Sequence, residues 1–408
     1  MHFEDSPAES AFRAEVRAWI SDQGPRFVPP PGASEAEVTQ IARAWQAARA
    51  QAGYAGFGLP VSIGGRPGSP MEEVIFLEEQ RAHPMARAEI MTLGTGMALP
   101  TILAHGRPEH LAALGRPTIC GEVIWCQLFS EPAAGSDLAG IRTAAVRDGE
   151  RWIINGQKVW TSGAFFADWG LLLARTDPTV PKHKGLTYFL LDMKSAGVEV
   201  RPLRQLGGRT DFNEVFLTDV SIPDSMRVGN VGGGWAVALT TLSNERFALT
   251  ADAAVGRNLI APLLRLAKRT IGPSGELLVD DVGFRERLAS YYVAVAGVEH
   301  ISARISTALS RGGNPGPQAT VGKMTLTRLL QSMGTFGMDL AGVAGGVIDP
   351  AADPELYEVQ QGLLLAPGYR MGGGTEEIGK NIIAERALGL PPDIRTDKDV
   401  PFNEVRSS

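Results

Sequence analysis

The most informative stretches of this 408-residue chain are FSEPAAGSD, at residues 129–137, and GQKVWTSG, at residues 156–163. In the first stretch, Pro132 ends the preceding strand because proline cannot donate to a ladder. Gly135 and Ser136 then allow the backbone to approach a phosphate or a ring edge. In the second stretch, the flat ring of Trp160 lies beside hydroxyl donors, which suits a planar ligand with polar edges. Taken singly, each stretch is more typical of ordinary structure, two hairpin turns and a core tryptophan, than of a ligand site.

The composition narrows the class of protein. With 44% hydrophobic residues, the chain can form two or three domains with substantial cores. A net charge of −6 argues against nucleic acid, which requires a basic face. The first residues lack the apolar region of a signal peptide, and no apolar run approaches a membrane span. Cys120 and Cys126 cannot form a disulfide framework. We therefore expect a cytoplasmic protein that binds neither membrane nor nucleic acid and holds no metal.

Helix signals dominate the beginning of the chain. Capping-box patterns start helices at Ser6 and Ser34, and Ser69-Pro70 starts a third. A further helix is expected at about 88–105. The glycines at 94 and 96 begin a dinucleotide-binding pattern but lie in this helical context, so we do not interpret them as that motif. Residues 1–120 are thus predicted to form an N-terminal α-helical domain.

The pattern changes at Gly121. Short apolar runs bounded by turn residues predict strands at 123–130, 151–154, 171–174, 187–192, 198–202 and 214–217. Asp148-Gly149 and Asn155-Gly156 predict hairpin turns. These features predict a middle β-domain at 121–234. Helices near 235–270, 280–311, 317–341 and 376–388 then predict an antiparallel bundle at 235–408.

Together, at this spacing and in this order, the two stretches resemble the flavin-binding β-domain of acyl-CoA dehydrogenases, and the similarity covers nearly the whole chain. The resemblance implies an α+β multidomain fold, with an N-terminal α-helical domain, a central antiparallel β-barrel-like domain and a C-terminal four-helix bundle. It also implies FAD as cofactor, an acyl-CoA substrate, an electron-transfer flavoprotein as acceptor and a homo-oligomer, either a dimer or a tetramer.

The resemblance assigns part of the flavin site to the β-domain. Ser130 would reach the pyrimidine edge of the ring, Trp160 would cover the ring, and Ser162 would hydrogen-bond close to N5. Ser136 would contact both the cofactor and the phosphopantetheine arm of the substrate. The implied cofactor-binding residues here are Gln127, Leu128, Phe129, Ser130, Ser136, Trp160, Thr161 and Ser162.

In this family a neighbouring subunit completes the flavin site, and this sequence departs from the usual pattern. Relatives often have an arginine before Thr-Phe-Gly, where this chain has Lys268 and Arg269 before Thr-Ile-Gly. Either basic residue would reach the pyrophosphate. Asp339 stands where relatives often have glutamine, and an acid fits a phosphate or adenosine poorly. The resemblance also places Thr375 and Glu377 at cofactor-contacting positions.

The reaction of the family requires a carboxylate that removes the α-proton of the thioester. Many members carry it just before the Gly-Thr of the last motif, where this chain has Gly373. A second group carries it on the first helix of the C-terminal bundle, before an arginine. Asn244-Glu245-Arg246 matches that pattern, although it could equally be an exposed helical pair. The resemblance therefore makes Glu245 the catalytic base, with substrate contacts from Ser136, Asn244, Arg246, Gly373 and Gly374.

The predicted function is FAD-dependent α,β-dehydrogenation of an acyl-CoA. One alternative is a catalytically reduced partner subunit in a hetero-oligomer, which Asp339 favours. Another is a related flavin oxidase that uses O₂. The absence of side chains at residues 372–374 leaves room for a branched, cyclic or bulky acyl group without requiring one.

Overall fold

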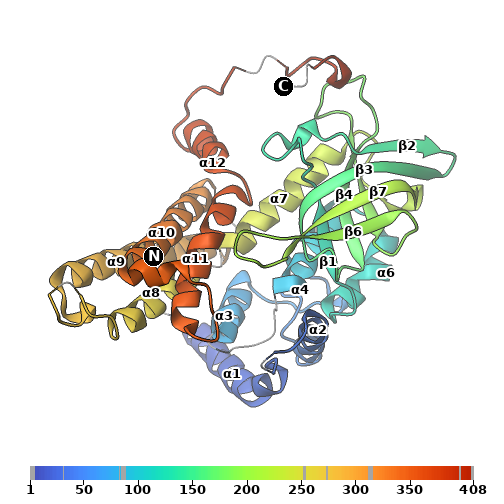
Figure 1. Cartoon of the computed structure of the whole chain (residues 1–408). Helices are drawn as coiled ribbons and strands as arrows, with labels where there is room; N and C mark the ends of the chain where they lie inside the picture. The colour runs from blue at the N-terminus through green and yellow to red at the C-terminus, as the bar shows by residue number, and fades with distance from the viewer. Residues whose placement is uncertain are drawn as a thin grey trace. The chain divides into compact units, whose positions relative to one another are not determined.

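The computed structural model describes residues 5–30, 32–81, 83, 89–250, 254–272, 274–310, 316–394 and 397–405. The described residues divide into two compact units. The first unit contains residues up to 205, residues 209–245 and the segment from 393 onward. The second unit contains residues 206–208 and 246–392. Figure 1 shows the sheet of the first unit in green and the helices of the second from yellow to red.

The first unit begins with helices whose starts are set by local capping. In α1 (Pro7–Gln23) and α2 (Glu35–Gln51), the N-cap serines Ser6 and Ser34 exchange hydrogen bonds with Glu9 and Glu37, as the sequence predicts. The helices that follow are α3 (Pro70–Arg81), α4 (Glu89–Leu93), α5 (Leu99–His105) and α6 (Pro108–Ile119). A π-helical turn, Gly94–Ala98, joins α4 to α5. The fully buried Trp45 anchors an aromatic core beneath α1, α2 and α3.

The sheet of the first unit has eight strands and is open. They are β1 (Trp125–Leu128), β2 (Ala144–Asp148), β3 (Arg151–Ser162), β4 (Trp169–Arg175), β5 (Leu186–Asp192), β6 (Val198–Leu203), β7 (Phe212–Pro223) and β8 (Arg227–Val228). The order is β6-β7-β3-β2-β4-β5-β8, with β1 paired to β4. Most neighbours are antiparallel, but β4 pairs in parallel with both β1 and β2.

One of the two predicted hairpin turns is confirmed and the other is wrong. Asp148 pairs with Arg151, so β2 and β3 form a hairpin around Gly149. At Asn155-Gly156 the chain does not turn: β3 continues along β7, and a register shift between Ile154 and Gly156 absorbs the irregularity. Pairing with a distant strand therefore overrides the local turn signal.

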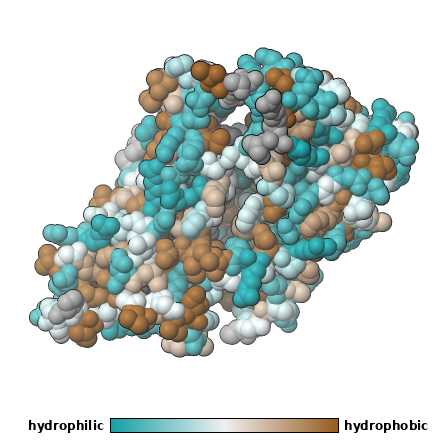
Figure 2. Space-filling model, turned by 45° about the horizontal axis from the view of Figure 1, so that its top comes forward, coloured by the Kyte–Doolittle hydropathy of each residue, from teal (hydrophilic) through white to brown (hydrophobic). Residues whose placement is uncertain are grey.

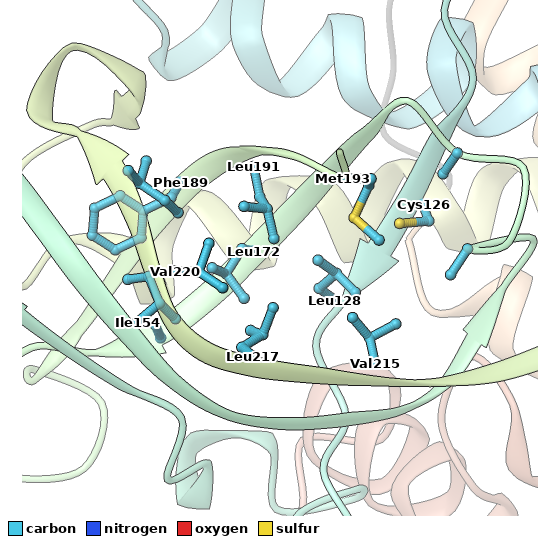
Figure 3. Packing of buried hydrophobic residues seen from close by; sticks show 14 of the residues in the cluster. Cys126, Leu128, Ile154, Leu172, Phe189, Leu191, Met193, Val215, Leu217 and Val220 are labelled. Atoms are coloured by element: carbon cyan, nitrogen blue, oxygen red, sulfur yellow. The ribbon is translucent and has the colours of Figure 1, made fainter. Parts of the chain in front are cut away.

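A hydrophobic core covers the inner face of the sheet. Figure 3 shows side chains from several strands pointing toward one another there, among them Leu128 from β1 and Val215 from β7. Cys126 belongs to this core, and burial raises the pKa of its thiol, so it behaves as a small hydrophobic residue. The core fixes the position of β1. Its carboxyl end leads directly into the segment that begins with Phe129 and Ser130, which we call the Ser130 loop.

Helix α7 (Gly234–Thr250) leaves the sheet, and its residues up to Glu245 belong to the first unit. The second unit contains α8 (Ala254–Ala267), α9 (Val282–Ser310), α10 (Gln318–Ala341), α11 (Pro354–Met371) and α12 (Glu376–Ile382). Side chains of α8, α9, α10 and α11 share one core. The four-helix bundle is confirmed, but its fourth helix is α11, which the sequence analysis missed.

The surface is mixed in polarity. Figure 2 shows hydrophobic groups between hydrophilic ones over the visible face. Among the residues that the structure describes, no helix has the length and apolar character needed to cross a membrane.

Candidate active site

Strand β1 and the loop after it carry the first motif. Leu128 and Phe129 are buried, with Leu128 in the core of the sheet and Phe129 packed edge-on against Tyr188 at 5.8 Å between ring centroids. Leu128 is therefore wholly enclosed in this structure, and Phe129 nearly so. Ser130 is half-buried at the end of the strand. The partly buried Gln127 does not stand alone, because its amide Nε2 lies 3.4 Å from Oε2 of Glu245.

The second motif lies at a bulge in β3, where the pairing with β7 shifts between Lys158 and Thr161. Trp160 has a φ of 59°, in the left-handed region that residues with a Cβ rarely adopt. Its side chain is 58% exposed and meets Phe212 edge-on. Strained residues of this kind persist where the surroundings enforce them and are frequent at ligand sites.

Trp160, Thr161 and Ser162 also provide the test of whether a flavin fits this part of the chain. Ser162 is exposed, and the hydroxyl of Thr161 is buried without a hydrogen-bond partner in the described part of the chain. An open aromatic face with a hydroxyl beside it, next to a buried hydroxyl without a partner, matches a planar ring with polar edges. The residues present therefore fit the cofactor that the resemblance implies.

A buried ion pair joins the two motifs. Lys158 Nζ, fully buried, donates to Oε1 of Glu131 at 2.8 Å and to the carbonyl of Phe129 at 2.9 Å. The N–H of Val159 donates to the carbonyl of Ser130 at 2.9 Å. Glu131 also accepts from the N–H groups of Arg142 and Thr143. The Ser130 loop and the Trp160 bulge are thus fixed relative to each other.

Each member of this pair stabilises the charged form of the other. Burial lowers the pKa of Lys158 to about 8, against the raising effect of the Glu131 carboxylate. Burial would raise the pKa of Glu131, but Lys158 and the N–H donors outweigh it and hold that pKa below its ordinary value. The sequence analysis quoted both residues without giving them a role. The sequence carries no signal for this pair, because the burial of Lys158 depends on the folding of β3 against the Ser130 loop.

Helix α7 brings the predicted base to β1. Asn244 and Glu245 are half-buried near its end. Thr241, one turn earlier on the same side of the helix, is buried against the hydroxyls of Thr101 and Tyr188, each 3.0 Å away. This contact fixes the turn that carries Glu245. The side chain of Arg246 lies outside the described residues.

The loop between β1 and β2 presents Ser136 to solvent. The carboxylate of its neighbour Asp137 accepts from Lys182 Nζ at 2.9 Å. Arg175, almost fully buried, donates to the carbonyls of Ala139 and Ile141, later in the same loop. The loop is therefore ordered although its serine is exposed.

In the second unit, the two basic residues predicted to reach the pyrophosphate, Lys268 and Arg269, differ in their contacts. Arg269 forms ion pairs with Asp353 and Glu355 at the start of α11, whereas Lys268 is exposed. Lys268 is consequently the better candidate for a phosphate. Asp339 is exposed near the end of α10.

The glycine-rich motif of the second unit is held from two sides. Lys323 Nζ, on α10, donates to the carbonyls of Gly372 and Gly374. Gly373 and Gly374 have φ values of 65° and 100°, which require glycine or strain its replacement. Thr375 caps α12 by accepting from the N–H of Ile378. Glu377 is exposed.

Glu376, next to this cap, is the buried acid of the motif. It accepts from Arg328 at 3.0 Å and from Arg370 at 2.7 Å. These two hydrogen bonds, with Arg328 the larger cause, lower the pKa of Glu376 to about 2. Arg328 also lines a surface cavity of about 290 Å³ with Val321, Met324, Thr325, Leu329 and Ile383. None of the predicted site residues lines that cavity. Through its two ion pairs, Glu376 holds the start of α12 against Arg328 of α10 and Arg370 of α11.

Comparison with known proteins agrees with this architecture. The family models for the acyl-CoA dehydrogenase N-terminal, middle and C-terminal domains match residues 6–122, 126–220 and 232–388. Acyl-CoA dehydrogenase IpdE1 of Mycobacterium tuberculosis is 35% identical over 390 residues, which cover 94% of this chain and 98% of the relative. Acyl-CoA dehydrogenase FadE34 of the same species is 42% identical over 327 residues, which cover 80% of this chain but 43% of the relative.

Solved structures have the same fold. The ChsE4-ChsE5 complex from Mycobacterium tuberculosis matches with a TM-score of 0.81 at 28% identity, covering 96% of this chain and 100% of the matched chain. The acyl-CoA dehydrogenase of Geobacillus kaustophilus matches with a TM-score of 0.78 at 23% identity, covering 96% of this chain and 100% of that one. With all three domain models matched in order and relatives similar over nearly their full length, the chain belongs to the acyl-CoA dehydrogenase family of oxidoreductases.

Proposed function

We propose that the protein binds FAD non-covalently and introduces an α,β double bond into an acyl-CoA thioester, with Glu245 as the base. One contact carries the proposal: Gln127 Nε2 lies 3.4 Å from Glu245 Oε2. Gln127 is three residues before Ser130, the residue assigned to the flavin edge. The acid on α7 therefore lies beside the strand that leads into the cofactor loop, although the two are 118 residues apart.

The residues divide the chemistry between them. The carboxylate of Glu245 takes the α-proton of the thioester, and the β-hydrogen leaves as hydride. FAD, when bound, supplies the acceptor for that hydride at N5 of its ring. Ser130, Trp160, Thr161 and Ser162 orient the ring, and the Lys158–Glu131 pair keeps their two segments in place. Gln127 acts on Glu245 as a hydrogen-bond donor, in addition to its proposed place at the cofactor.

The remaining assignments follow the same scheme. Ser136, exposed on an ordered loop, contacts the pantetheine arm, and Asn244 and Arg246 contact the polar part of the substrate. Gly373 and Gly374 leave space for the acyl group. Lys268, Asp339, Thr375 and Glu377 complete the cofactor site across a subunit contact, with Arg269 the weaker basic candidate because of its ion pairs.

We further propose a homo-oligomer, either a dimer or a tetramer, an electron-transfer flavoprotein as acceptor and a cytoplasmic location. The domain division at residues 120 and 234 is part of the same proposal. Exposed hydrophobic side chains at Val343, Val347 and Ile348 in the second unit favour a covered surface. A hetero-oligomeric partner subunit is the second candidate. It is favoured by the exposed Asp339 and by the similar chain solved in a complex of two differently named proteins.

The test is reduction of the bound flavin by a panel of acyl-CoA thioesters, including bulky and branched acyl groups, without oxygen. We expect the purified chain to be yellow and at least one thioester to bleach it. Glu245→Gln should retain FAD and bind the same thioester, while bleaching slows by about 10²–10⁴-fold, the span assigned to a placed acid–base group.

Glu122→Gln is the matched control, since it removes an exposed carboxylate from the same unit. It should bleach at the wild-type rate. Wild-type turnover by Glu245→Gln would refute the assignment of the base. A colourless chain that stays colourless with added FAD, yet acquires flavin with a second protein, would favour the partner-subunit candidate. Oxygen consumption without another acceptor would favour an oxidase.

A further inference from the structure

Residues 397–405, which we call the C-terminal strap, form a short segment on the sheet unit. Pro401 forms a β-bridge with Pro181. The N–H of Phe402 donates to the carbonyl of Val180, and that of Asn403 to the carbonyl of Pro178, both at 2.9 Å. Figure 1 shows this red segment returning to the green loops of the sheet. The strap is thus paired through its backbone with the loop that follows β4.

Phe402 of the strap packs against a buried cation, the guanidinium of Arg175. The guanidinium carbon of Arg175 lies 3.5 Å from the centre of the Phe402 ring. Arg175 is 5% exposed, so this cation–π contact is made in a desolvated place, where such contacts are strongest. The ring of Phe402 therefore covers one face of the guanidinium and keeps water from it.

Arg175 in turn orders the segment that we call the Ser136 loop (residues 132–141). Its nitrogens donate to the carbonyls of Ala139 at 2.6 Å, Ile141 at 3.0 Å and Lys182 at 3.2 Å. The carbonyls of Ala139 and Ile141 belong to this loop, and that of Lys182 belongs to the loop that follows β4, so the side chain of Arg175 ties the two loops together. Moving Arg175 would loosen the end of the loop directly.

A second contact links the strap to the same loop. Lys182 Nζ donates to Asp397 at 2.6 Å and to Asp137, next to Ser136, at 2.9 Å. One ammonium therefore joins the strap to the loop at Asp137, while Phe402 is linked through Arg175 to the carbonyls of Ala139 and Ile141. Both contacts converge on the segment that presents Ser136.

We propose that the C-terminal strap, through Phe402 stacked on Arg175, holds the Ser136 loop in the conformation that binds the phosphopantetheine arm of coenzyme A. The inference rests on the proposed function, in which Ser136 contacts that arm. Phe402 and Arg175 are positioning residues in this scheme: neither touches the substrate, and both set the affinity for it.

The test uses the full-length flavoprotein and three substitutions of one residue. Phe402→Ala removes the ring, Phe402→Leu keeps apolar bulk without a π-face, and Phe402→Trp keeps the π-face. Binding of coenzyme A is measured by calorimetry, and amide hydrogen exchange of residues 132–141 by mass spectrometry. Glu404→Ala, which changes an exposed side chain of the same strap, is the control.

We expect Phe402→Ala and Phe402→Leu to weaken coenzyme A binding by about tenfold or more, and Phe402→Trp by less than about threefold, given the strength of a desolvated cation–π contact. Exchange in the Ser136 loop should rise in the same two variants, while FAD content and the thermal midpoint stay near wild type. Equal coenzyme A affinity in all variants would refute the inference.

Phe402→Leu that binds coenzyme A like wild type would also refute it, since packing alone would then suffice. A wild-type protein that binds no coenzyme A would refute the proposed function instead. In that case, faster exchange of the Ser136 loop in Phe402→Ala would still identify the strap as its support, and unchanged exchange would remove that role too.

Discussion

Lys158 and Glu131 form an ion pair of 2.8 Å, in which the lysine is fully buried and the carboxylate is 8% exposed. Their residues flank the two segments assigned to the flavin, Ser130 and Trp160. Because the pair also bonds the carbonyl of Phe129 and two backbone N–H groups, it sets the spacing of those segments before any ligand arrives.

The first prediction concerns the loss of one charge from this pair. Lys158→Met should lower the free energy of unfolding by about 3–5 kcal/mol, the cost of leaving a buried partner uncompensated. Urea unfolding followed by tryptophan fluorescence measures the change. Adding Glu131→Gln to Lys158→Met should recover part of the loss, because the buried charge is then gone. The single variant Glu131→Gln completes the comparison. If the double variant loses as much free energy of unfolding as the two single variants together, the pair does not act as a unit.

Local signals in the sequence predicted local structure well. The capping boxes at Ser6 and Ser34 are confirmed, because each depends on residues within one turn of helix. The turn at Gly149 is confirmed for the same reason. The turn at Asn155-Gly156 is wrong, since a partner strand more than fifty residues away decides the backbone there.

The rest depends on contacts between distant residues. Helix α11 contains Pro367, which reads as a break in a sequence, yet the helix continues because it packs along the bundle core through Val359 and Ala366. The Glu245–Gln127 contact and the Phe402–Arg175 stack likewise join residues far apart in the chain. Hydrophobic periodicity carries no information on such pairs. The roles carried over from the family resemblance stay predictions until they are tested.

The second prediction concerns how the free energy of unfolding depends on pH through Glu376. The two arginines lower the pKa of Glu376 from 4.5 to about 2, so its stabilising contribution is present above pH 4.5 and is lost as the pH falls through about 2. Glu376→Gln should therefore lower the free energy of unfolding at neutral pH, by about 1–3 kcal/mol for hydrogen bonds to a charged group. The dependence of stability on pH between 4.5 and 2 should become less steep. Glu377→Gln, at the exposed neighbouring position, is the control and should change the free energy of unfolding at neutral pH by less than about 0.5 kcal/mol.

The last prediction concerns the strain at Trp160, whose φ is 59° and whose side chain is 58% exposed. A residue with a Cβ pays about 1–2 kcal/mol for the left-handed conformation, and glycine does not. Within an ordinary strand, glycine makes the protein less stable than alanine does. Here the order should reverse. The free energy of unfolding of Trp160→Gly, measured by urea unfolding, should exceed that of Trp160→Ala by about 1 kcal/mol.

The matched position for this comparison is Val146, on the neighbouring strand β2, where glycine should be the less stable substitution. Both Trp160 variants should bind FAD more weakly than wild type, by a similar factor, because each lacks the ring. The two measurements separate the two causes. The free energy of unfolding reports the strain of the backbone at residue 160, and the affinity for FAD reports the contact made by the Trp160 ring. If Trp160→Gly is no more stable than Trp160→Ala, the bulge relaxes on substitution and the backbone is not held by the fold. If FAD affinity is unchanged in both, Trp160 does not contact the flavin, and the strain serves another purpose.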